Sequence, residues 1–276
     1  MKILALVTQT LHELSAKATL IVLAGISTVI ILGTSLAVSS GSSADGETLM
    51  LFGNAITPPT TAENLGGLIR QMQAGMAGGL FAGVILFGVF ATAGIVPDTL
   101  EKGTVDLYLS KPIARWELLL GRSLGAVAVM LINILYFIGA IWLLFGLKIG
   151  YWNHSLLLAA LTMAFVFASL FSIVAFLGVL SRNMAIPIIG AFLYLLIIGS
   201  VLESREHGLY LISENVIYRG AIDGLYYVLP QLSAMQRVVS QLITQTSVDW
   251  KPFVQSILSS ALIFGGAAAL LQRKDF

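Results

Sequence analysis

The sequence predicts an all-α integral membrane protein with six transmembrane helices. Of its 276 residues, 57% are hydrophobic and only 11% are charged, whereas an ordinary soluble domain is roughly 25% charged. A soluble fold of this size cannot bury so much apolar surface, so the surplus must face lipid. Six apolar segments are long enough to cross a bilayer, and in lipid a helix satisfies the hydrogen bonds of its own backbone.

Residues 1–17 predict an amphipathic helix that lies flat on the membrane before the first span. Apolar side chains recur there at helical spacing, and polar side chains fall on another face. The apolar positions are Leu4, Val7, Leu11 and Leu14, and the polar positions are Gln9, His12 and Glu13. A short frayed N-terminus is the alternative.

A bilayer core requires about 20 consecutive apolar residues for each helix. This criterion selects segments 18–38, 74–96, 123–147, 155–180, 185–202 and 252–271. The first segment could instead be a signal peptide, but its apolar stretch exceeds the roughly 7–15 residues typical of one. Six spans place both termini on the same side of the membrane.

The distribution of Lys and Arg predicts the orientation. These residues are dense in the N-terminus, the 97–122 loop, the 181–184 turn and the C-terminal tail, and sparse in the longer loops of the other side. Cytoplasmic loops carry the excess of positive charge. We therefore expect a multi-pass protein of a bacterial or archaeal plasma membrane, with both termini in the cytoplasm.

The loops expected outside the cell differ in character. Residues 39–71 are small, polar and rich in turn formers, which predicts an irregular loop. Segment 204–251 is longer and contains an apolar stripe at helical spacing after Pro230, which predicts an amphipathic interfacial helix. The stripe consists of Leu232, Met235, Val239, Leu242 and Ile243.

Segment 97–122 is the most highly charged part of the chain, with eight charged side chains in 26 residues. Asp98 and Glu101 have the spacing of a helix-capping pair, and Pro112 suits the first turn of a second helix. A short element with both charge and an apolar face is suited to docking on a partner protein. The alternative is an ordinary solvated connection between the second and third spans.

This segment resembles the stretch that follows the second span in permeases of ABC-2 type transporters. The matching residues are Glu101, Gly103, Thr104, Leu109, Ser110, Pro112, Arg115 and Gly121, with Arg122 where lysine is usual. Family members often carry a second acid two residues before the first, where this chain has Thr99; Asp98 is out of register by one. The layout of the interfacial helix, spans and external helices also resembles that family.

The resemblance implies a permease subunit of an ATP-binding cassette transporter, acting beside a second permease copy or a similar chain. Two copies of a separate cytoplasmic ATPase would bind ATP and Mg, and transport is expected to run outward. A helix of segment 97–122 would dock on each ATPase and transmit its closure to the spans. The residues expected to couple to the ATPase are Glu101, Gly103, Thr104, Pro112, Arg115, Gly121 and Arg122.

Gly75, Gly79 and Gly83 in the second span lie four residues apart, which lets another helix approach one face closely. This spacing predicts either a seam near the transport path or subunit interface, or ordinary packing between helices. Ionisable side chains are almost absent from the spans, which argues against a proton- or sodium-driven carrier. Asn133, in the third span, is a candidate for a hydrogen bond between helices.

Motifs for catalysis are missing, so we expect no catalytic, cofactor-binding or metal-binding residues and no enzyme activity in this chain. The sequence contains no phosphate-binding loop, no cysteine, and three histidines that are far apart. A net charge of +1 gives no reason to expect a nucleic-acid partner. The alternatives to a permease are a secondary transporter or channel, and a non-transporting membrane scaffold or intramembrane enzyme.

Overall fold

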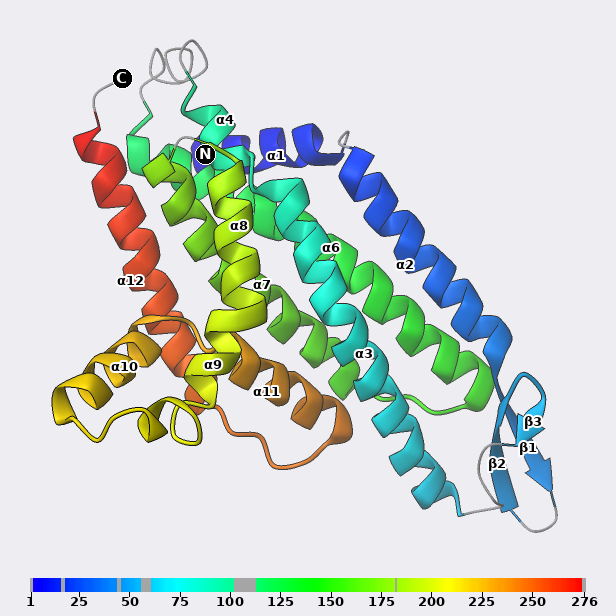
Figure 1. The fold of residues 1–276 in the computed structure, drawn as a ribbon. Coiled ribbons are helices and arrows are strands. Elements are labelled where there is room, and N and C mark those ends of the chain that lie inside the picture. Colours follow the sequence, from blue (N-terminus) through cyan, green and yellow to red (C-terminus); the bar gives the residue numbers. More distant parts are fainter. Residues whose placement is uncertain are drawn as a thin grey trace.

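The computed structural model describes residues 2–15, 18–43, 46–55, 61–101, 113–181 and 183–274. Helices make up most of these residues, and the chain forms an elongated bundle (Figure 1). In chain order, the helices of the N-terminal part are α1 (Lys2–Ser15), α2 (Ala18–Ala37), α3 (Ala62–Thr92) and α4 (Ile95–Thr99). The others are α6 (Arg115–Ile149), α7 (Ser155–Ser181), α8 (Ala185–Leu193), α9 (Gly199–Glu203), α10 (Val216–Val228), α11 (Leu232–Thr244) and α12 (Lys251–Arg273).

Four helical stretches of the described chain are long and apolar enough to cross a membrane. They are α6, α7, α12 and residues Ala185–Glu203, in which α8 and α9 are joined by a π-helical turn at Tyr194–Ile198. Two shorter apolar stretches are Ile21–Ala37 and Ile85–Thr99. The predicted all-α membrane class is therefore confirmed in its main feature, while the number of six spans stays a prediction.

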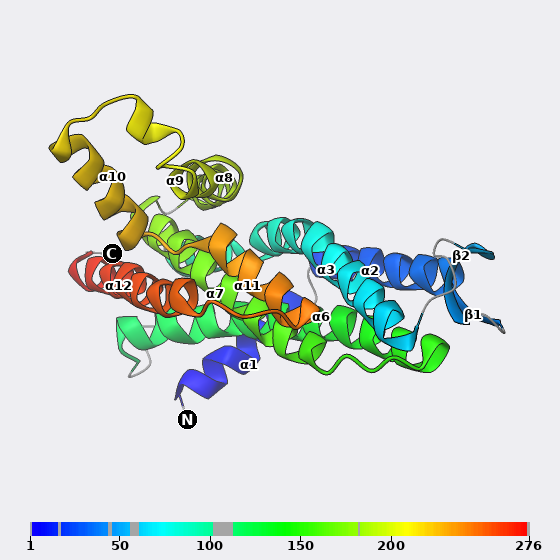
Figure 2. The same cartoon turned by 90° about the horizontal axis from the view of Figure 1, so that it is seen from below.

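The long helices run side by side around α7, which packs against α6, α12, α11 and α8. Fully buried Phe167 and Phe171 of α7 contribute to this core. Both chain termini lie at the same end of the bundle, where α1 crosses it (Figure 1). Seen from below, α8, α9 and α10 lie on one side of the layer made by α12, α7 and α6, and α1 lies on the other side (Figure 2).

Helix α6 is continuous from Arg115 to Ile149. It begins where the backbone N–H of Ala114 donates to the Glu117 carboxylate at 2.9 Å, and it ends at Gly150, which adopts the left-handed conformation with φ +77°. A helix of this length spans about 52 Å, well beyond a bilayer core of about 30 Å. The end of segment 97–122 therefore lies on the same rigid helix as the predicted span 123–147.

The prediction of an irregular loop over residues 39–71 is wrong. Antiparallel strands β1 (Val38–Ser43) and β2 (Gly46–Leu51) pair there, and the short β3 (Asn54–Ala55) pairs with β2. Helix α3 also begins at Ala62, twelve residues before the predicted start at 74. Its first turns bury Leu65, Ile69 and Gln73 at helical spacing. Polar residues lie between these three, so this part of α3 is not a continuous apolar run and the criterion used for membrane spans does not detect it.

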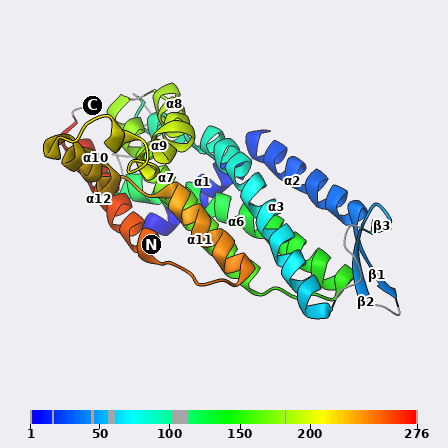
Figure 3. The same cartoon turned by 60° about the horizontal axis from the view of Figure 1, so that its bottom comes forward.

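Helix α11 is amphipathic as predicted, and its five apolar stripe residues are all buried. Their partners are α7 and α3, so protein rather than lipid covers this face (Figure 3). The fully buried side chain of Asn153 fixes the end of α11. Its amide donates to Gln73 at 2.9 Å and to the Ile243 carbonyl at 3.0 Å, and its oxygen accepts from Gln245 at 3.2 Å.

Gly75, Gly79 and Gly83 face open space among the described residues. A Cβ atom built on any of them has no neighbour within 4 Å. Close helix packing at these glycines within the chain is therefore not observed, and a seam with another subunit stays a prediction.

Candidate functional site

Two glycines of α6 allow α1 to lie directly on that helix. A Cβ atom at Gly121 would lie 2.6 Å from Cβ of Leu6, and one at Gly125 would lie 2.5 Å from Cβ of Thr10. Both distances are shorter than a side chain tolerates, so only glycine permits this approach. The glycines are four residues apart, as are Leu6 and Thr10, so one turn of each helix is in register with the other.

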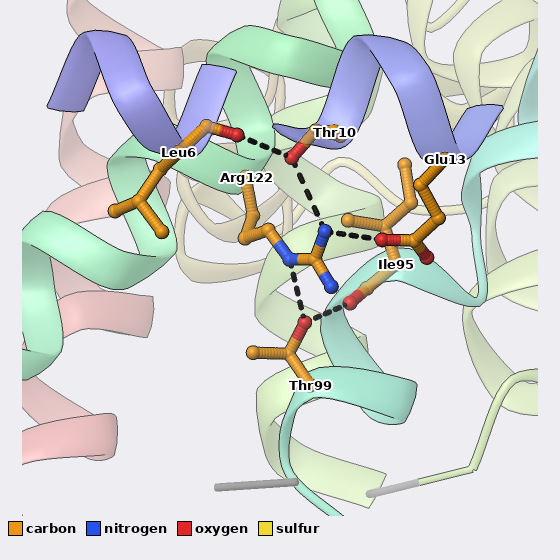
Figure 4. Close-up of polar contacts among 6 residues, drawn as sticks. All are labelled: Leu6, Thr10, Glu13, Ile95, Thr99 and Arg122. Atoms are coloured by element: carbon orange, nitrogen blue, oxygen red, sulfur yellow. Dashed lines mark hydrogen bonds and ion pairs between the residues drawn. The ribbon is translucent and has the colours of Figure 1, made fainter. Parts of the chain in front are cut away.

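Arg122 lies beneath this crossing, with a side chain that is only 5% exposed. Its Nε donates to the Thr99 hydroxyl at 3.0 Å, and its Nη1 donates to the Thr10 hydroxyl at 3.3 Å (Figure 4). The same Nη1 forms an ion pair with Oε2 of Glu13 at 2.5 Å. One guanidinium of α6 therefore joins α1, through two residues, to α4.

Each threonine in this network accepts from Arg122 and donates to its own helix. The Thr99 hydroxyl donates to the Ile95 carbonyl at 2.6 Å, and the Thr10 hydroxyl donates to the Leu6 carbonyl at 2.8 Å (Figure 4). Burying a cation is costly unless it is paired and hydrogen-bonded. These three oxygen atoms contribute to this compensation, and the planar fork of arginine reaches them from one position.

Arg115 makes a second junction at the start of α6. Its Nη1 donates to the carbonyls of Leu271 and Gln272 at 3.3 Å and of Lys274 at 2.5 Å. The last carbonyls of a helix lack partners within the helix, and a cation at that end is favourable. Lys274 in turn donates through Nζ to the carbonyls of Val179 and Leu180 at the end of α7. Arg115 thus connects α6 to α12 and, through Lys274, to α7.

The predicted coupling residues fall into three groups. Glu101 is exposed just after α4. Gly103, Thr104 and Pro112 lie outside the described residues, so the structure says nothing about them. Gly121, Arg122 and Arg115 contact other helices of the same chain, and the first two are buried.

Sequence reasoning missed the partners of Arg122. Glu13 and Thr10 belong to an N-terminal stretch that the sequence predicts only to be amphipathic, and Thr99 stands out in the sequence only as a departure from the family pattern. A signal was present in Gly121 and Gly125, whose spacing of four predicts a close helix contact at that point.

The space beside Arg122 is nearly filled. A cavity of about 10 Å³ remains between α4, α6 and the end of α12, lined by Thr99, Leu118 and Leu271 among others, and this is room for no more than about one water molecule. The junction is therefore suited to holding helices together rather than to binding a substrate.

The comparison with protein families agrees with this architecture. The profile of the family described as "ABC-2 family transporter protein" matches residues 18–276, nearly the whole chain. A search among curated proteins found none that matches. The chain is therefore a multi-pass membrane protein that belongs to the ABC-2 transporter family of permeases.

Proposed function

We propose that this chain is the permease subunit of an ATP-binding cassette transporter and that the segment between α4 and α6 couples it to a separate ATPase. The observation that carries the proposal is the anchoring of both ends of this segment. Thr99, two residues before Glu101, binds Arg122, and Arg115 binds the end of α12. A force applied between these anchors acts on α1, α4, α6 and α12 together.

The coupling is mechanical. When two ATPase subunits close on ATP and Mg, an element docked on them moves as a rigid body. Arg122 makes α1 and α4 follow α6, and Arg115 makes α12 follow it. Because these contacts are polar and buried or half-buried, their rearrangement costs free energy, so the helices move as a unit rather than slide separately.

The proposed assembly contains two permeases, either identical or similar, and two ATPase subunits in a bacterial or archaeal cytoplasmic membrane. The α1 end of the bundle, where both termini lie, faces the cytoplasm, in keeping with the excess of Lys and Arg at that end. Transport runs outward, and the six predicted spans of each chain form the path. ATP hydrolysis takes place on the partner.

The charge reversal Arg115→Glu tests the coupling. The carboxylate would repel the carbonyls of α12 that Arg115 now binds, so α6 and α12 would separate. We expect transport by the complex to fall roughly tenfold, a coupling energy of about 1.4 kcal/mol, while the ATPase still co-purifies and hydrolyses ATP. Transport into vesicles and phosphate release measure the two quantities.

Arg273→Glu is the matched control, because Arg273 is an exposed arginine at the same end of α12. It should leave both transport and hydrolysis unchanged. Wild-type transport in the Arg115→Glu complex would contradict the coupling route, and a tagged wild-type chain that recovers no ATP-binding cassette protein would contradict the function itself.

A further inference from the structure

An open groove of about 630 Å³ lies between α1, α2 and α6. Its volume falls within the range of roughly 300–1,000 Å³ that is typical of small-ligand sites. The lining is mostly apolar, with a few polar side chains. It consists of Leu11, His12, Ala24, Thr28, Val129, Ile132, Asn133 and Tyr136.

The walls of the groove continue into surfaces that face lipid. On α2 the side chains of Ile21, Val29 and Leu32 are 59–69% exposed, and on α6 Ile132 is 61% exposed. Helix α6 is long and apolar enough to cross a membrane, and exposed apolar side chains along such a helix and its neighbour are suited to contact with lipid. The groove is therefore continuous with hydrocarbon, and a lipid chain reaches it without crossing water.

An unpaired polar atom on the α6 wall indicates where a hydrogen-bond donor of a ligand would lie. Oδ1 of Asn133 is buried and has no hydrogen-bond partner among the described residues. Because the half-buried Asn133 side chain lines the groove, a rotation of its amide about χ2 is needed to turn this oxygen toward a bound ligand. One turn further along α6, the Tyr136 and Thr28 hydroxyls lie 2.9 Å apart and bridge α6 to α2. Because the Thr28 hydroxyl donates to the Ala24 carbonyl at 2.7 Å, Tyr136 supplies the proton between them and has none left for Asn133. A buried acceptor without a donor is unfavourable, and a ligand O–H or N–H would offset this cost.

We propose that this groove binds the hydrocarbon chain of a membrane lipid and that a hydroxyl or amide N–H on that chain donates to Asn133. The apolar lining covers the chain, and the Thr28–Tyr136 bridge limits how far it enters between the helices. Leu11 and His12 close the groove on the α1 side, next to Thr10 and Glu13, which bind Arg122. The bound lipid therefore contacts the same helix that the Arg122 network holds.

Photoaffinity labelling in lipid nanodiscs of phosphatidylethanolamine and phosphatidylglycerol tests the site. The probes are two phospholipids with a diazirine on one acyl chain, one chain hydroxylated and one unsubstituted, and mass spectrometry locates the adducts. We expect the hydroxylated probe to label peptides that contain residues 21–32 and 129–136. Adducts spread evenly over all exposed apolar helices would overturn the proposal.

A matched pair of variants on α2 tests the groove itself. Ala24→Phe fills the groove, whereas Gly25→Phe adds the same ring to a neighbouring exposed position where a Cβ meets nothing within 4 Å. Labelling should fall about tenfold in the first variant, or ~1.4 kcal/mol of binding, and stay unchanged in the second. Equal labelling of the two variants would overturn the site.

The isosteric variant Asn133→Leu tests the donor without filling or emptying the groove. It should reduce labelling by the hydroxylated probe to the level of the unsubstituted probe, and an undiminished preference would overturn the role of Asn133. The sequence contains no cysteine, so Thr28→Cys provides a single thiol in the groove. A disulfide between two chains at that thiol would show that a second copy, not lipid, occupies the groove and would also overturn the proposal.

Discussion

Two arginine–acid pairs lie at opposite ends of the bundle and organise the chain in different ways. Arg122 and Glu13 are 109 residues apart in the sequence, and their ion pair joins separate helices. Arg205 and Asp223 are 18 residues apart and meet at 2.8 Å. In the second pair the arginine also stacks on the Tyr226 ring at 3.7 Å, so the cluster folds one segment onto itself.

The helices that carry the two pairs also differ in how extensively they pack on the rest of the bundle. Helix α1 packs more extensively on α6 than on any other element. The main contacts of α10 are with α9 and α12, and both are small. The side chains of Leu211, before α10, and of Val216 and Ile217, at the start of α10, are each 82% exposed. A change at Arg122 should therefore reach several helices, and a change at Arg205 should stay local.

The largest effect is expected from Glu13→Ala, because it removes the carboxylate that pairs with the buried guanidinium of Arg122. Breaking a fully buried pair from one side costs roughly 3–5 kcal/mol. Glu13 is 36% exposed, so we expect about 2–3 kcal/mol. Thermal unfolding in detergent micelles, followed by circular dichroism, measures the loss.

The double variant Glu13→Ala with Arg122→Met is the control, because it removes both charges and keeps an apolar side chain of similar length. It should recover most of the lost stability, since replacement of a buried pair by apolar residues is often neutral. If the double variant were as unstable as Glu13→Ala alone, the interaction of the two charges would not be the cause.

The next effect concerns the contact of α1 with α6. Gly121→Ala places a Cβ atom 2.6 Å from Cβ of Leu6, and neither atom can rotate away, so α1 must shift. We expect a loss of about 1–3 kcal/mol. Gly139→Ala on the same helix meets no atom within 4 Å and should instead gain roughly 0.5–1 kcal/mol from helix propensity. Equal melting temperatures for the two variants would show that α1 does not rest on Gly121.

The sequence predicts the all-α membrane class because long apolar helices need continuous runs of apolar residues, which is a local property. The stripe from Leu232 to Ile243 is predicted for the same reason, since helical spacing fixes which side chains share a face. Its partner is not predicted. Spacing alone cannot tell whether lipid or α7 and α3 cover that face.

The sequence does not predict the candidate site, because its contacts join residues that are far apart in the chain. Arg122 reads as an exposed cation in a charged loop, and only the fold shows that Glu13 and Thr99 surround it. The hairpin of β1 and β2 is missed for a related reason. Val38–Ser43 is rich in serine and glycine and has little intrinsic strand preference, so pairing with β2 decides its conformation.

The smallest effect is expected from acidification of the Arg205 cluster. Hydrogen bonds from Tyr210, at 2.6 Å, and from Arg205 lower the pKa of Asp223 below its ordinary value of 3.8. The folded segment therefore binds fewer protons than the unfolded one near that pH, and stability rises with pH there. The contribution of Asp223 is complete above about 3.8 and is lost as the pH falls through its lowered pKa.

Hydrogen–deuterium exchange of residues 205–226, corrected for the intrinsic rate, measures this loss. Protection should fall at acidic pH in that segment while the α1–α6 junction keeps its protection. Asp223→Asn should reproduce the loss at neutral pH, because an amide cannot pair with the Arg205 cation. Asp249→Asn is the control, since that carboxylate accepts from the backbone N–H of Lys251 at 3.1 Å and should leave the segment protected. Loss of protection at the α1–α6 junction in Asp223→Asn would show that the two ends of the bundle are coupled. This result would contradict the local role that the short sequence separation of Arg205 and Asp223 predicts.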